Sequence, residues 1–568
     1  MHLSLLLSKS VFKMASLKDS SAWKALENHF QQIAHVHMCD LFSKDKNRFK
    51  RLSLALNGLF LDYSKNRITE ETLQLLIKLA KARDVEEWRD RMFAGEFINT
   101  TEERAALHVA LRLPINENSK TLASAISNVV PDVLAMRKKM RVISSEIRSG
   151  EWTGATGAKI KTIVHIGTGG SHLGPEMVCQ SQGSIEPLGP DLVFISNVDG
   201  AQIFDALNNL APETTLFIVA SKTFTTEETI TNARTAKNWL VKALGKDSMP
   251  KHFIAVSGNE RAVAEFGITP DNVFGLWDWV GGRFSIWSAI GLPIAIALGM
   301  DRFEEMLSGA NNMDRHFLKE PLEKNMPVIL GLIGIWNIDF LDAQGLAILP
   351  YDEGLRGFPN YLRQLEMESN GKALDRFGRP VEVSTATMVF GDPGTRGQHA
   401  FYQALHQGGQ LIACDFIAPI ENRHAIGNHH DRLLANYFAQ TEALMKGRDA
   451  EAADGIMAAR NVPDHLRDTQ RSHRKFDGNR PTNSILLDRV DPFTLGQIIA
   501  LYEHKVFVQA IIWGINPFDQ WGVEWGKELA AQVLDVLEND SSKIEACSST
   551  QGLISRFKAH THKLKKKS

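Results

Sequence analysis

The sequence predicts an α/β fold that contains two doubly wound parallel sheets, with helical arms at both ends of the chain. Short apolar, β-branched runs alternate with helix-like segments, which is the pattern of βαβ units in a parallel sheet. The alternation occurs twice, between residues 162 and 258 and again between residues 346 and 419. A chain of 568 residues is long enough for two or more hydrophobic cores.

The expected elements follow from these patterns. The expected strands are 162–167, 191–197, 214–221 and 252–258 in the first series and 346–352, 386–392 and 410–419 in the second. Segments with apolar residues three or four apart predict helices over 21–38, 71–93, 126–147 and 228–244. We therefore expect an N-terminal helical arm over 1–120, a first α/β domain over 121–297, a second over 298–510 and a C-terminal helical arm over 511–568.

Composition and charge exclude several classes of protein. The formal net charge is −2, which does not suggest a nucleic-acid surface. The four cysteines are isolated and none forms a CxxC pair, so neither a disulfide framework nor a cysteine zinc site is indicated. This cysteine usage fits a reducing compartment, and we expect the protein in the cytoplasm.

The two ends of the chain carry short unusual stretches. No window approaches the roughly 18 apolar residues that a membrane span needs. The apolar run LSLLL near the start is too short for a signal peptide and is interrupted by Lys9, and Met14 is an alternative initiator. We expect the final KLKKKS to be a solvated basic terminus.

The stretch VHIGTGGSHLG, residues 164–174, has the glycines of a phosphate-binding turn. Gly167 and Gly169 fit the dinucleotide pattern G-x-G-x-x-G, but position 172 is histidine. The Gly-Lys pairs of the chain lack the Ser or Thr that completes a P-loop. The turn follows a strand and leads into a helix with Pro175 at its start, where open α/β sheets bind ligands. A mere tight turn is the alternative.

A second polar loop, SKTFTTEET at residues 221–229, also follows a strand and opens a helix. It offers one ammonium and several hydroxyls beside the free N–H groups of a helix start, which together make a compact anion site. Thr225 and Glu228 have the spacing of a capping box. Because nothing here recognises a base, the loop suits a small phosphate monoester. A capped polar surface loop is the alternative.

Three segments contain candidate catalytic groups. In FPNYLRQLEMESNGK, a predicted helix that ends at Asn370, Gln364 and Glu368 share a face, and Glu368 could be a general base. His399 follows a Gly-rich turn near a helix start and could exchange protons. Arg283 follows a Gly-Gly turn and could stabilise an oxyanion. The alternatives are a solvent-facing glutamate, a surface histidine and a structural ion pair.

The segment INPFDQWGVEWGK, residues 515–527, predicts a helix with Asn516 as its N-cap and Pro517 behind it. Gln520, Glu524 and Lys527 would then lie on one face. An ordinary amphipathic helix is the alternative. HAIGNHHDR, residues 424–432, contains no HExxH motif, and we expect no metal site there.

Six blocks together resemble the phosphoglucose isomerase family over nearly the whole chain. They are IGTGGSHLGP, SKTFTTEET, VGGRFSIWSAIGL, MESNGK, GTRGQHAFYQALHQG and GINPFDQWGVEWGK. VGGRFS and FDQWGVEWGK are highly specific to that family. The resemblance implies two sugar-isomerase (SIS-type) α/β domains, a homodimer or higher oligomer, and no cofactor. The implied reaction is the reversible interconversion of D-glucose 6-phosphate and D-fructose 6-phosphate in glycolysis and gluconeogenesis.

The resemblance also implies roles for individual residues. Glu368 would move a proton between C2 and C1, and Arg283 would stabilise the enediolate. His399 and Lys527 would open the sugar ring, with His399 reaching the site from the neighbouring subunit. The implied substrate contacts are a phosphate clamp of Ser221, Lys222, Thr223 and Thr226, and further contacts at Gly170, Ser171, Gln364 and Gln520.

Departures from the family pattern leave some questions open. His172, Arg363, Arg396, Pro517 and Trp525 replace residues that are commoner in the family, although none is a proposed chemical group. A non-catalytic phosphosugar-binding regulator is the competing hypothesis. It would need the phosphate clamp but not the catalytic groups, whose joint presence favours the enzyme. A secondary activity on mannose 6-phosphate also stays open.

Overall fold

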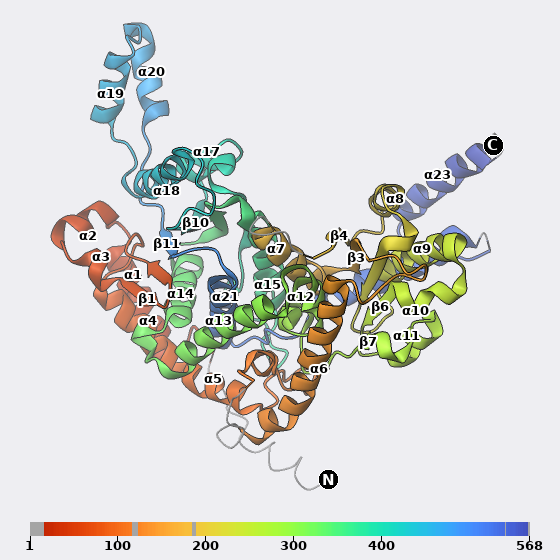
Figure 1. Ribbon diagram of the computed structural model, residues 1–568. Coiled ribbons are helices and arrows are strands. Elements are labelled where there is room, and N and C mark those ends of the chain that lie inside the picture. Colours follow the sequence, from red (N-terminus) through yellow and green to blue (C-terminus); the bar gives the residue numbers. More distant parts are fainter. Residues whose placement is uncertain (1–15, 116–122, 184–188, 540, 566–568) are drawn as a thin grey trace. The chain divides into compact units, whose positions relative to one another are not determined.

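The computed structural model describes residues 16–115, 123–183, 189–539 and 541–565, and Figure 1 shows its helices and strands. Residues up to Phe518 form one compact unit, and Asp519–Ser568 form a second unit, which is described by itself below. The expectations for the first residues, including Lys9 and Met14, and for the last residues of the KLKKKS tail lie outside the described part. The proposed domain boundaries stay predictions.

The first sheet is parallel throughout, as predicted, with the strand order β4-β3-β5-β6-β7. Its strands are β3 (Thr162–Gly167), β4 (Asp191–Ile195), β5 (Thr215–Ala220), β6 (Phe253–Val256) and β7 (Val273–Phe274). β3, β5 and β6 are buried along their whole length, which explains their continuous apolar sequences. The helices that follow these strands are α7 (Leu173–Gln182), α8 (Gly200–Asn208), α9 (Glu227–Leu244), α10 (Met249–His252) and α11 (Glu260–Phe266).

The second sheet is mixed rather than parallel throughout, which corrects the prediction. Its order is β1-β2-β11-β10-β8-β9, with strands β1 (Ser53–Leu56), β2 (Leu59–Asp62), β8 (Ala343–Pro350), β9 (Met388–Gly391), β10 (Leu411–Pro419) and β11 (Thr482–Leu487). β8, β9, β10 and β11 run parallel, whereas the β1–β2 hairpin joins β11 antiparallel.

This hairpin lies in a region that we expected to be helical. Its turn is Asn57-Gly58, and both residues have positive φ, 37° and 87°. Asn-Gly between two short apolar runs is the sequence signal of a tight hairpin, because both turn positions need a left-handed backbone. The strands are only four residues long and lie between helices, so the helical periodicity on either side obscured them.

Helices cover both sheets and connect them. The N-terminal helices are α1 (Ser21–Ile33), α2 (Met38–Lys44), α3 (Arg48–Arg51), α4 (Glu70–Ala82), α5 (Val85–Ala94) and α6 (Ser124–Ser149). The later helices of the first unit are α12 (Leu292–Leu298), α13 (Met300–Lys319), α14 (Met326–Ile335), α15 (Phe358–Asn370), α16 (Gly394–Gln398), α17 (Tyr402–Gln407), α18 (His429–Lys446), α19 (Ala450–Ala459), α20 (Asp464–Arg474) and α21 (Pro492–Trp513). No helix of the described residues is long and apolar enough to cross a membrane.

Helix α21 is the centre of the first unit. Nearly all of its 22 residues are buried, and it packs against α13, α14 and α15. Asp491 and Thr494 form a capping box at its start. Cationic side chains bind the carbonyl groups at its end: Arg83 Nε donates to Ile512 O at 2.9 Å and Arg376 Nε to Gly514 O at 3.1 Å. These cations favourably oppose the negative end of the helix dipole.

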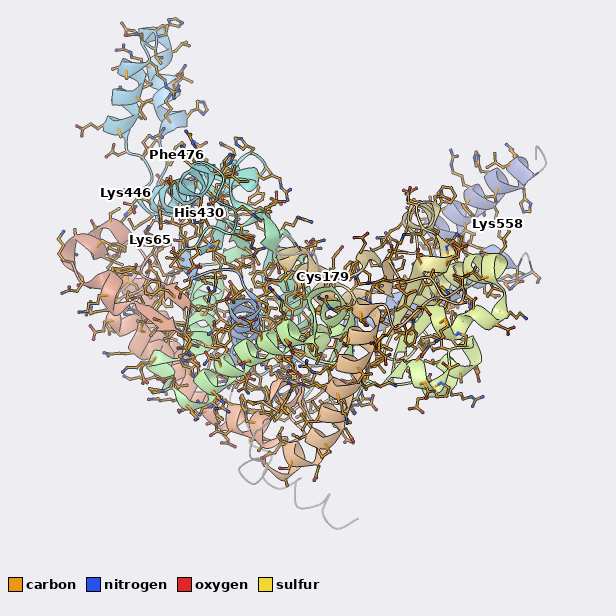
Figure 2. The ribbon with its side chains drawn as sticks, in the orientation of Figure 1. Lys65, Cys179, His430, Lys446, Phe476 and Lys558 are labelled. Carbon is orange, nitrogen blue, oxygen red and sulfur yellow. The ribbon has the colours of Figure 1, made fainter. Side chains whose placement is uncertain are left out.

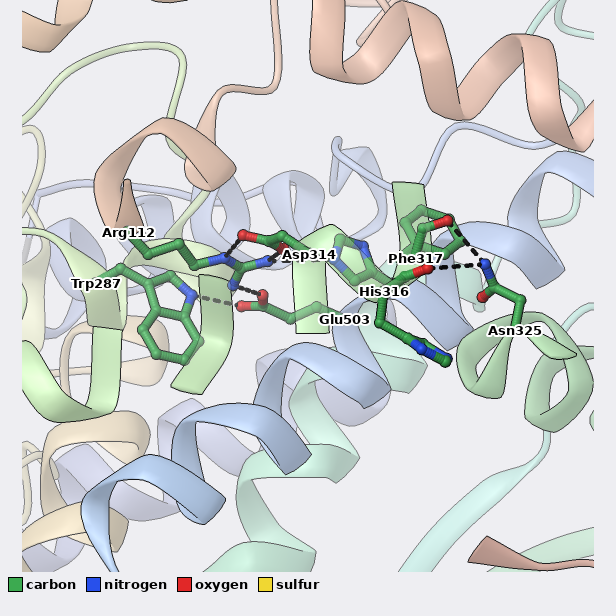
Figure 3. A network of polar contacts seen from close by, with 8 residues as sticks. Arg112, Trp287, Asp314, His316, Phe317, Asn325 and Glu503 are labelled. Atoms are coloured by element: carbon green, nitrogen blue, oxygen red, sulfur yellow. Dashed lines mark hydrogen bonds and ion pairs between the residues drawn. The ribbon is translucent and has the colours of Figure 1, made fainter. Parts of the chain in front are cut away.

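A buried group of charges connects three parts of this core (Figure 3). Arg112, which is completely buried, donates through Nε and Nη2 to both carboxylate oxygens of Asp314 on α13 and through Nη1 to Glu503 on α21. Trp287 Nε1 donates to the other oxygen of Glu503 at 2.8 Å. Burial by itself lowers the pKa of Arg112, but the two carboxylates raise it overall. The arginine therefore stays charged inside the core.

The second unit contains α22 (Glu524–Glu538) and α23 (Ser548–Lys565). It has little core of its own, since Val536 is its one buried apolar residue among those described. Leu553 and Phe557 on α23 are more than half exposed. Burial within this unit therefore contributes little to its stability.

Acid should destabilise the fold through His252, which lies at the end of α10 and is buried. Its Nδ1 donates to Thr215 O at 2.6 Å, and its Nε2 accepts from the backbone N–H of Ala155 at 2.9 Å, so the ring is neutral. Burial lowers its pKa. Between that lowered pKa and about 6.5, only the unfolded chain binds the proton, so the free energy of unfolding falls as pH falls. His252→Gln removes this titrating group. We therefore expect the free energy of unfolding of the variant to fall less steeply on acidification, by up to about 1.4 kcal/mol per pH unit, measured by urea unfolding from pH 7.5 to 5. An unchanged pH slope in the variant would contradict the assignment.

Candidate functional site

The glycine-rich stretch after β3 forms a tight turn over Gly169–Ser171. Gly169 has φ +59°, and a Cβ atom there would lie 3.1 Å from Nε2 of Gln364. A Cβ atom at Gly170 would collide with the backbone of Gly282 and lie 2.7 Å from the backbone nitrogen of Arg283. The glycines thus allow this turn to lie directly against two segments that carry predicted site residues. Helix α7 begins at Leu173, so Pro175 is its third residue rather than its first.

The loop after β5 brings the expected phosphate clamp together. Ser221 Oγ lies 3.0 Å from Thr226 Oγ1 and accepts from the backbone N–H of Phe224 at 3.1 Å. Thr223 Oγ1 accepts from Thr225 Oγ1 at 2.8 Å. The predicted capping box is wrong: the N-cap of α9 is Thr226, and no side chain caps the helix. The first N–H groups of α9 therefore have no side-chain cap to compete with an anion.

Lys222 connects this loop to the segment that leads to Arg283. Its Nζ donates to the backbone oxygens of Asp278 at 3.1 Å and of Val280 at 3.2 Å. Burial lowers the pKa of Lys222, and the Asp278 carboxylate acts in the opposite direction. The Lys222 ammonium therefore ties the loop after β5 to the segment 278–280, and its expected contact with a phosphate stays a prediction.

Glu368 lies in the last turn of α15, and the helix ends at Asn370 as predicted. Gln364, one turn earlier, shares its face and donates from Nε2 to Oε2 of Glu368 at 3.0 Å. The Glu368 side chain is 23% exposed, so solvent reaches it although most of its surface is covered. This geometry suits a base with a fixed orientation.

Arg283 is buried and lies against Glu368. Its Nη1 is 3.6 Å from Oε2 of Glu368, and its Nε donates to Ser369 Oγ at 2.6 Å. Nη2 donates to the backbone oxygen of Pro517. A guanidinium held at several points brings fixed positive charge next to the carboxylate, where an oxyanion can be stabilised.

These groups meet at the carboxyl ends of β3 and β5. The two strands are neighbours, but β4 lies on the other side of β3, so the chain reverses its direction across the sheet at this point. Ligands of open α/β sheets bind at such switch points. Thr168 Oγ1 lies 3.3 Å from Thr229 Oγ1 and thereby joins the turn after β3 to the first turns of α9.

His399 is not joined to this group. It follows the last residue of α16 and lies three residues before α17. Its side chain is exposed and has no hydrogen-bond partner within the described ranges. None of the hydrogen bonds or ion pairs described connects it with Glu368, so its role stays a prediction.

Gln520 and Lys527 belong to the second unit. The predicted helix from Asn516 is wrong: α22 begins at Glu524, and Asn516 Nδ2 instead donates to Asn99 Oδ1 and Thr101 Oγ1. Gln520 precedes a 3₁₀ turn and is therefore not on the helix face that carries Lys527. Gly522 and Gly526 weaken the helical tendency of this stretch.

A cavity of about 890 Å³ lies elsewhere in the first unit, at the carboxyl ends of β8 and β10. It is lined by residues such as Tyr351 and Arg423, and by Cys179 and His430, which Figure 2 labels. None of the predicted site residues lines it. In the described part of the chain, no group of three or more His, Cys, Asp or Glu side chains is arranged to hold a metal ion.

Comparisons with known proteins show the family of this chain. The model of the family "Phosphoglucose isomerase" matches residues 62–554. The chain belongs to this family. It is 50% identical over 550 residues to a glucose-6-phosphate isomerase of Methylococcus capsulatus, covering 96% of this chain and all of that protein. A glucose-6-phosphate isomerase of Chlorobium luteolum is 48% identical over 548 residues, covering 96% of this chain and 98% of that protein.

A solved structure confirms the fold of this phosphoglucose isomerase family member. The crystal structure of a glucose-6-phosphate isomerase from Chlamydia trachomatis superimposes with a TM-score of 0.82 at 28% identity, covering 96% of this chain and all of that one. The α/β fold class predicted from sequence is therefore confirmed, apart from the antiparallel β1–β2 hairpin.

The departures from the family pattern have structural explanations in two cases. Arg396 is held by Asp392 at 2.8 and 2.5 Å and lies 3.8 Å from Glu353. His172 is buried, with Nε2 3.2 Å from Glu176. The side chains of Arg363 and Trp525 are exposed. At position 517 the backbone oxygen, which any residue offers, binds Arg283.

Residues that no sequence motif indicated hold the site residues in place. Ser369, next to Glu368, holds Arg283, and Lys372 Nζ donates to Asn516 O at 2.8 Å. Behind α15, Lys505 Nζ donates to Glu366 Oε2 at 2.7 Å, with both side chains buried. The sequence signal for these contacts was only that Glu366 and Ser369 lie within two residues of Glu368.

Proposed function

We propose that this chain interconverts D-glucose 6-phosphate and D-fructose 6-phosphate with Glu368 as the proton-transferring base. The observation that carries the proposal is the group of Gln364, Glu368 and Arg283, which lies against the Gly169–Ser171 turn. The Ser221–Thr226 loop on the neighbouring strand is the phosphate site. The reaction belongs to glycolysis and gluconeogenesis, and we place the protein in the cytoplasm.

The reaction needs a proton to move between adjacent carbons of the open-chain sugar. Glu368 removes the proton from C2 and returns it to C1, or the reverse, through a cis-enediolate. Arg283 stabilises the oxygen that becomes negative, because its charge is already in place before the reaction. Gln364 fixes the orientation of Glu368 at 3.0 Å. The phosphate is remote from the reacting carbons, so its binding energy orients them.

Ring opening needs a proton donated to the ring oxygen and another removed from the anomeric hydroxyl, which is at C1 in glucose 6-phosphate and at C2 in fructose 6-phosphate. We assign these steps to His399 and Lys527 together. The exposed ring of His399 supports a role at a neighbouring copy of the chain, which requires a homodimer. No step is assigned to a metal or a cofactor.

A first experiment follows glucose 6-phosphate formation from fructose 6-phosphate with an NADP-dependent dehydrogenase, in the presence of a chelator. We expect robust turnover. Binding of fructose 6-phosphate without turnover would favour the phosphosugar-binding regulator instead.

A mixing experiment tests the assignment of His399 to the partner subunit. Inactive Glu368→Gln and His399→Asn homodimers are dissociated, mixed in equal amounts and reassociated. If His399 serves the neighbouring Glu368, each heterodimer has one complete site, and about a quarter of the wild-type activity returns. If both groups come from one subunit, the heterodimer contains two defective sites, and the mixture stays as inactive as its parents. Each variant mixed with itself is the control.

A further inference from the structure

A buried histidine lies beside the Gly169–Ser171 turn. His165, in β3, is completely inaccessible, and its Nε2 lies 2.7 Å from the carbonyl oxygen of Ser171. A carbonyl oxygen only accepts, so Nε2 carries the proton. Burial lowers the pKa of His165 to about 4, hence the ring is neutral near pH 7. The titratable groups that act on it are His172 and Glu176, and Phe194 packs 5.5 Å from its ring.

The Gly169–Ser171 turn is also closely packed on its other sides. A Cβ atom at Gly167 would lie 2.8 Å from Ser171 O and 3.1 Å from His165 Nε2, so strand end, ring and turn are in close contact. On its other side, the turn contacts Gly282 and Arg283 through Gly170 and approaches Gln364 through Gly169. Displacement of the turn would therefore disturb the backbone that carries the Arg283 side chain and the surroundings of the Gln364 amide, and both side chains lie on Glu368.

We propose that His165 is a positioning residue, whose Nε2–H group holds the Ser171 carbonyl and so keeps the Gly169–Ser171 turn in register with Arg283 and Gln364. Its effect on the reaction is indirect, through these two side chains and Glu368. The inference rests on the proposed function of the site. It adds a residue to which no role has been assigned above.

The test compares two substitutions at position 165 with the same substitutions at a matched histidine. His165→Gln keeps an N–H donor on a side chain of similar reach, whereas His165→Leu removes the donor. His252 is equally buried and donates to Thr215 O, but Thr215 begins β5, at the opposite end of the same sheet from the Gly169–Ser171 turn. His252→Gln and His252→Leu therefore measure the general cost of losing such a contact.

The expected result is a change in kcat rather than in KM. For the folded fraction, determined by near-UV circular dichroism, we expect His165→Leu to lose at least about tenfold in kcat, since small displacements of catalytic groups have effects of this size. KM should stay within about threefold, and His165→Gln should recover most of kcat. Both His252 variants should lower the melting temperature while kcat per folded molecule stays within about twofold of wild type.

Three outcomes would overturn the proposal: a folded His165→Leu protein with wild-type kcat, a His165→Gln protein as slow as the leucine variant, or equal kcat losses at position 252. If the leucine variant does not fold, hydrogen exchange in the glutamine variant decides. The backbone N–H groups of Ser171 and His172, which donate to Thr168 O and Gly169 O, should keep wild-type protection there. Rapid exchange in a fully active glutamine variant would show that the turn needs no such support.

Glu368→Gln separates the proposal for His165 from the proposed function. Turnover in Glu368→Gln would refute the proposed site, whereas loss of turnover in Glu368→Gln together with a fully active His165→Leu protein would refute only the role of His165.

Discussion

Glu368→Gln should reduce kcat by about 10²–10⁴-fold while fructose 6-phosphate still binds, because an amide cannot accept the proton that a general base removes. The substitution keeps the shape of the side chain. One oxygen remains for the Gln364 amide, which lies 3.0 Å away in the wild type. Binding is measured by isothermal titration and turnover by the coupled dehydrogenase assay.

The control is Glu260→Gln, which removes an exposed carboxylate from the first turn of α11. It should leave both kcat and KM unchanged. If Glu368→Gln retained turnover within tenfold of the wild type, Glu368 would be an ordinary partly buried carboxylate, and the base would have to be sought elsewhere.

Arg112→Met should have the largest effect on stability. It leaves the carboxylates of Asp314 and Glu503 inside the core without the cation that now bridges them. Removing one partner of a buried ion pair costs about 3–5 kcal/mol, a large part of the stability of a typical domain. We expect the variant to unfold at much lower urea concentration than the wild type, or to accumulate in the insoluble fraction.

The matched control is Arg261→Met. Arg261 is also an arginine that pairs with a carboxylate, Glu265 at 2.9 Å, but both side chains are largely exposed. This substitution should leave the urea midpoint unchanged, since exposed pairs contribute little. Equal effects of the two substitutions would mean that the buried group of charges contributes no more than a surface pair.

The sequence predicted those parts of the fold in which a single pattern of apolar residues runs through a whole helix or strand. β3 and β5 of the first sheet are buried along their whole length, so their continuous apolar runs were distinctive. The β1–β2 hairpin was missed although Asn57-Gly58 marks it, because only four residues on each side carry the strand pattern. The start of α22 was misplaced because Asn516 and Pro517 look like a helix start, whereas Asn516 binds Asn99 instead.

The sequence predicted which residues form the candidate site, but it did not predict the contacts that hold them in place. Gln364 and Glu368 share a face because helical spacing fixes their relation locally. The contact of Arg283 with Glu368 joins segments 85 residues apart, and no local rule determines it. The same holds for His165, whose apolar strand context concealed its contact with the Ser171 carbonyl.

The position of α21 determines when the chain can fold during its synthesis. Residues 492–513 form the helix around which α13, α14 and α15 pack, and β11 must be present before the β1–β2 hairpin can join the second sheet. Arg83 also finds its partner, the carbonyl of Ile512, only at this helix, and Arg112 finds there the second of its two carboxylates, Glu503. At about 5–20 residues per second, the ribosome needs on the order of half a minute or more to reach this helix, and until then the apolar faces that await it have no partner. The emerging chain therefore depends on protection from aggregation until α21 has been made.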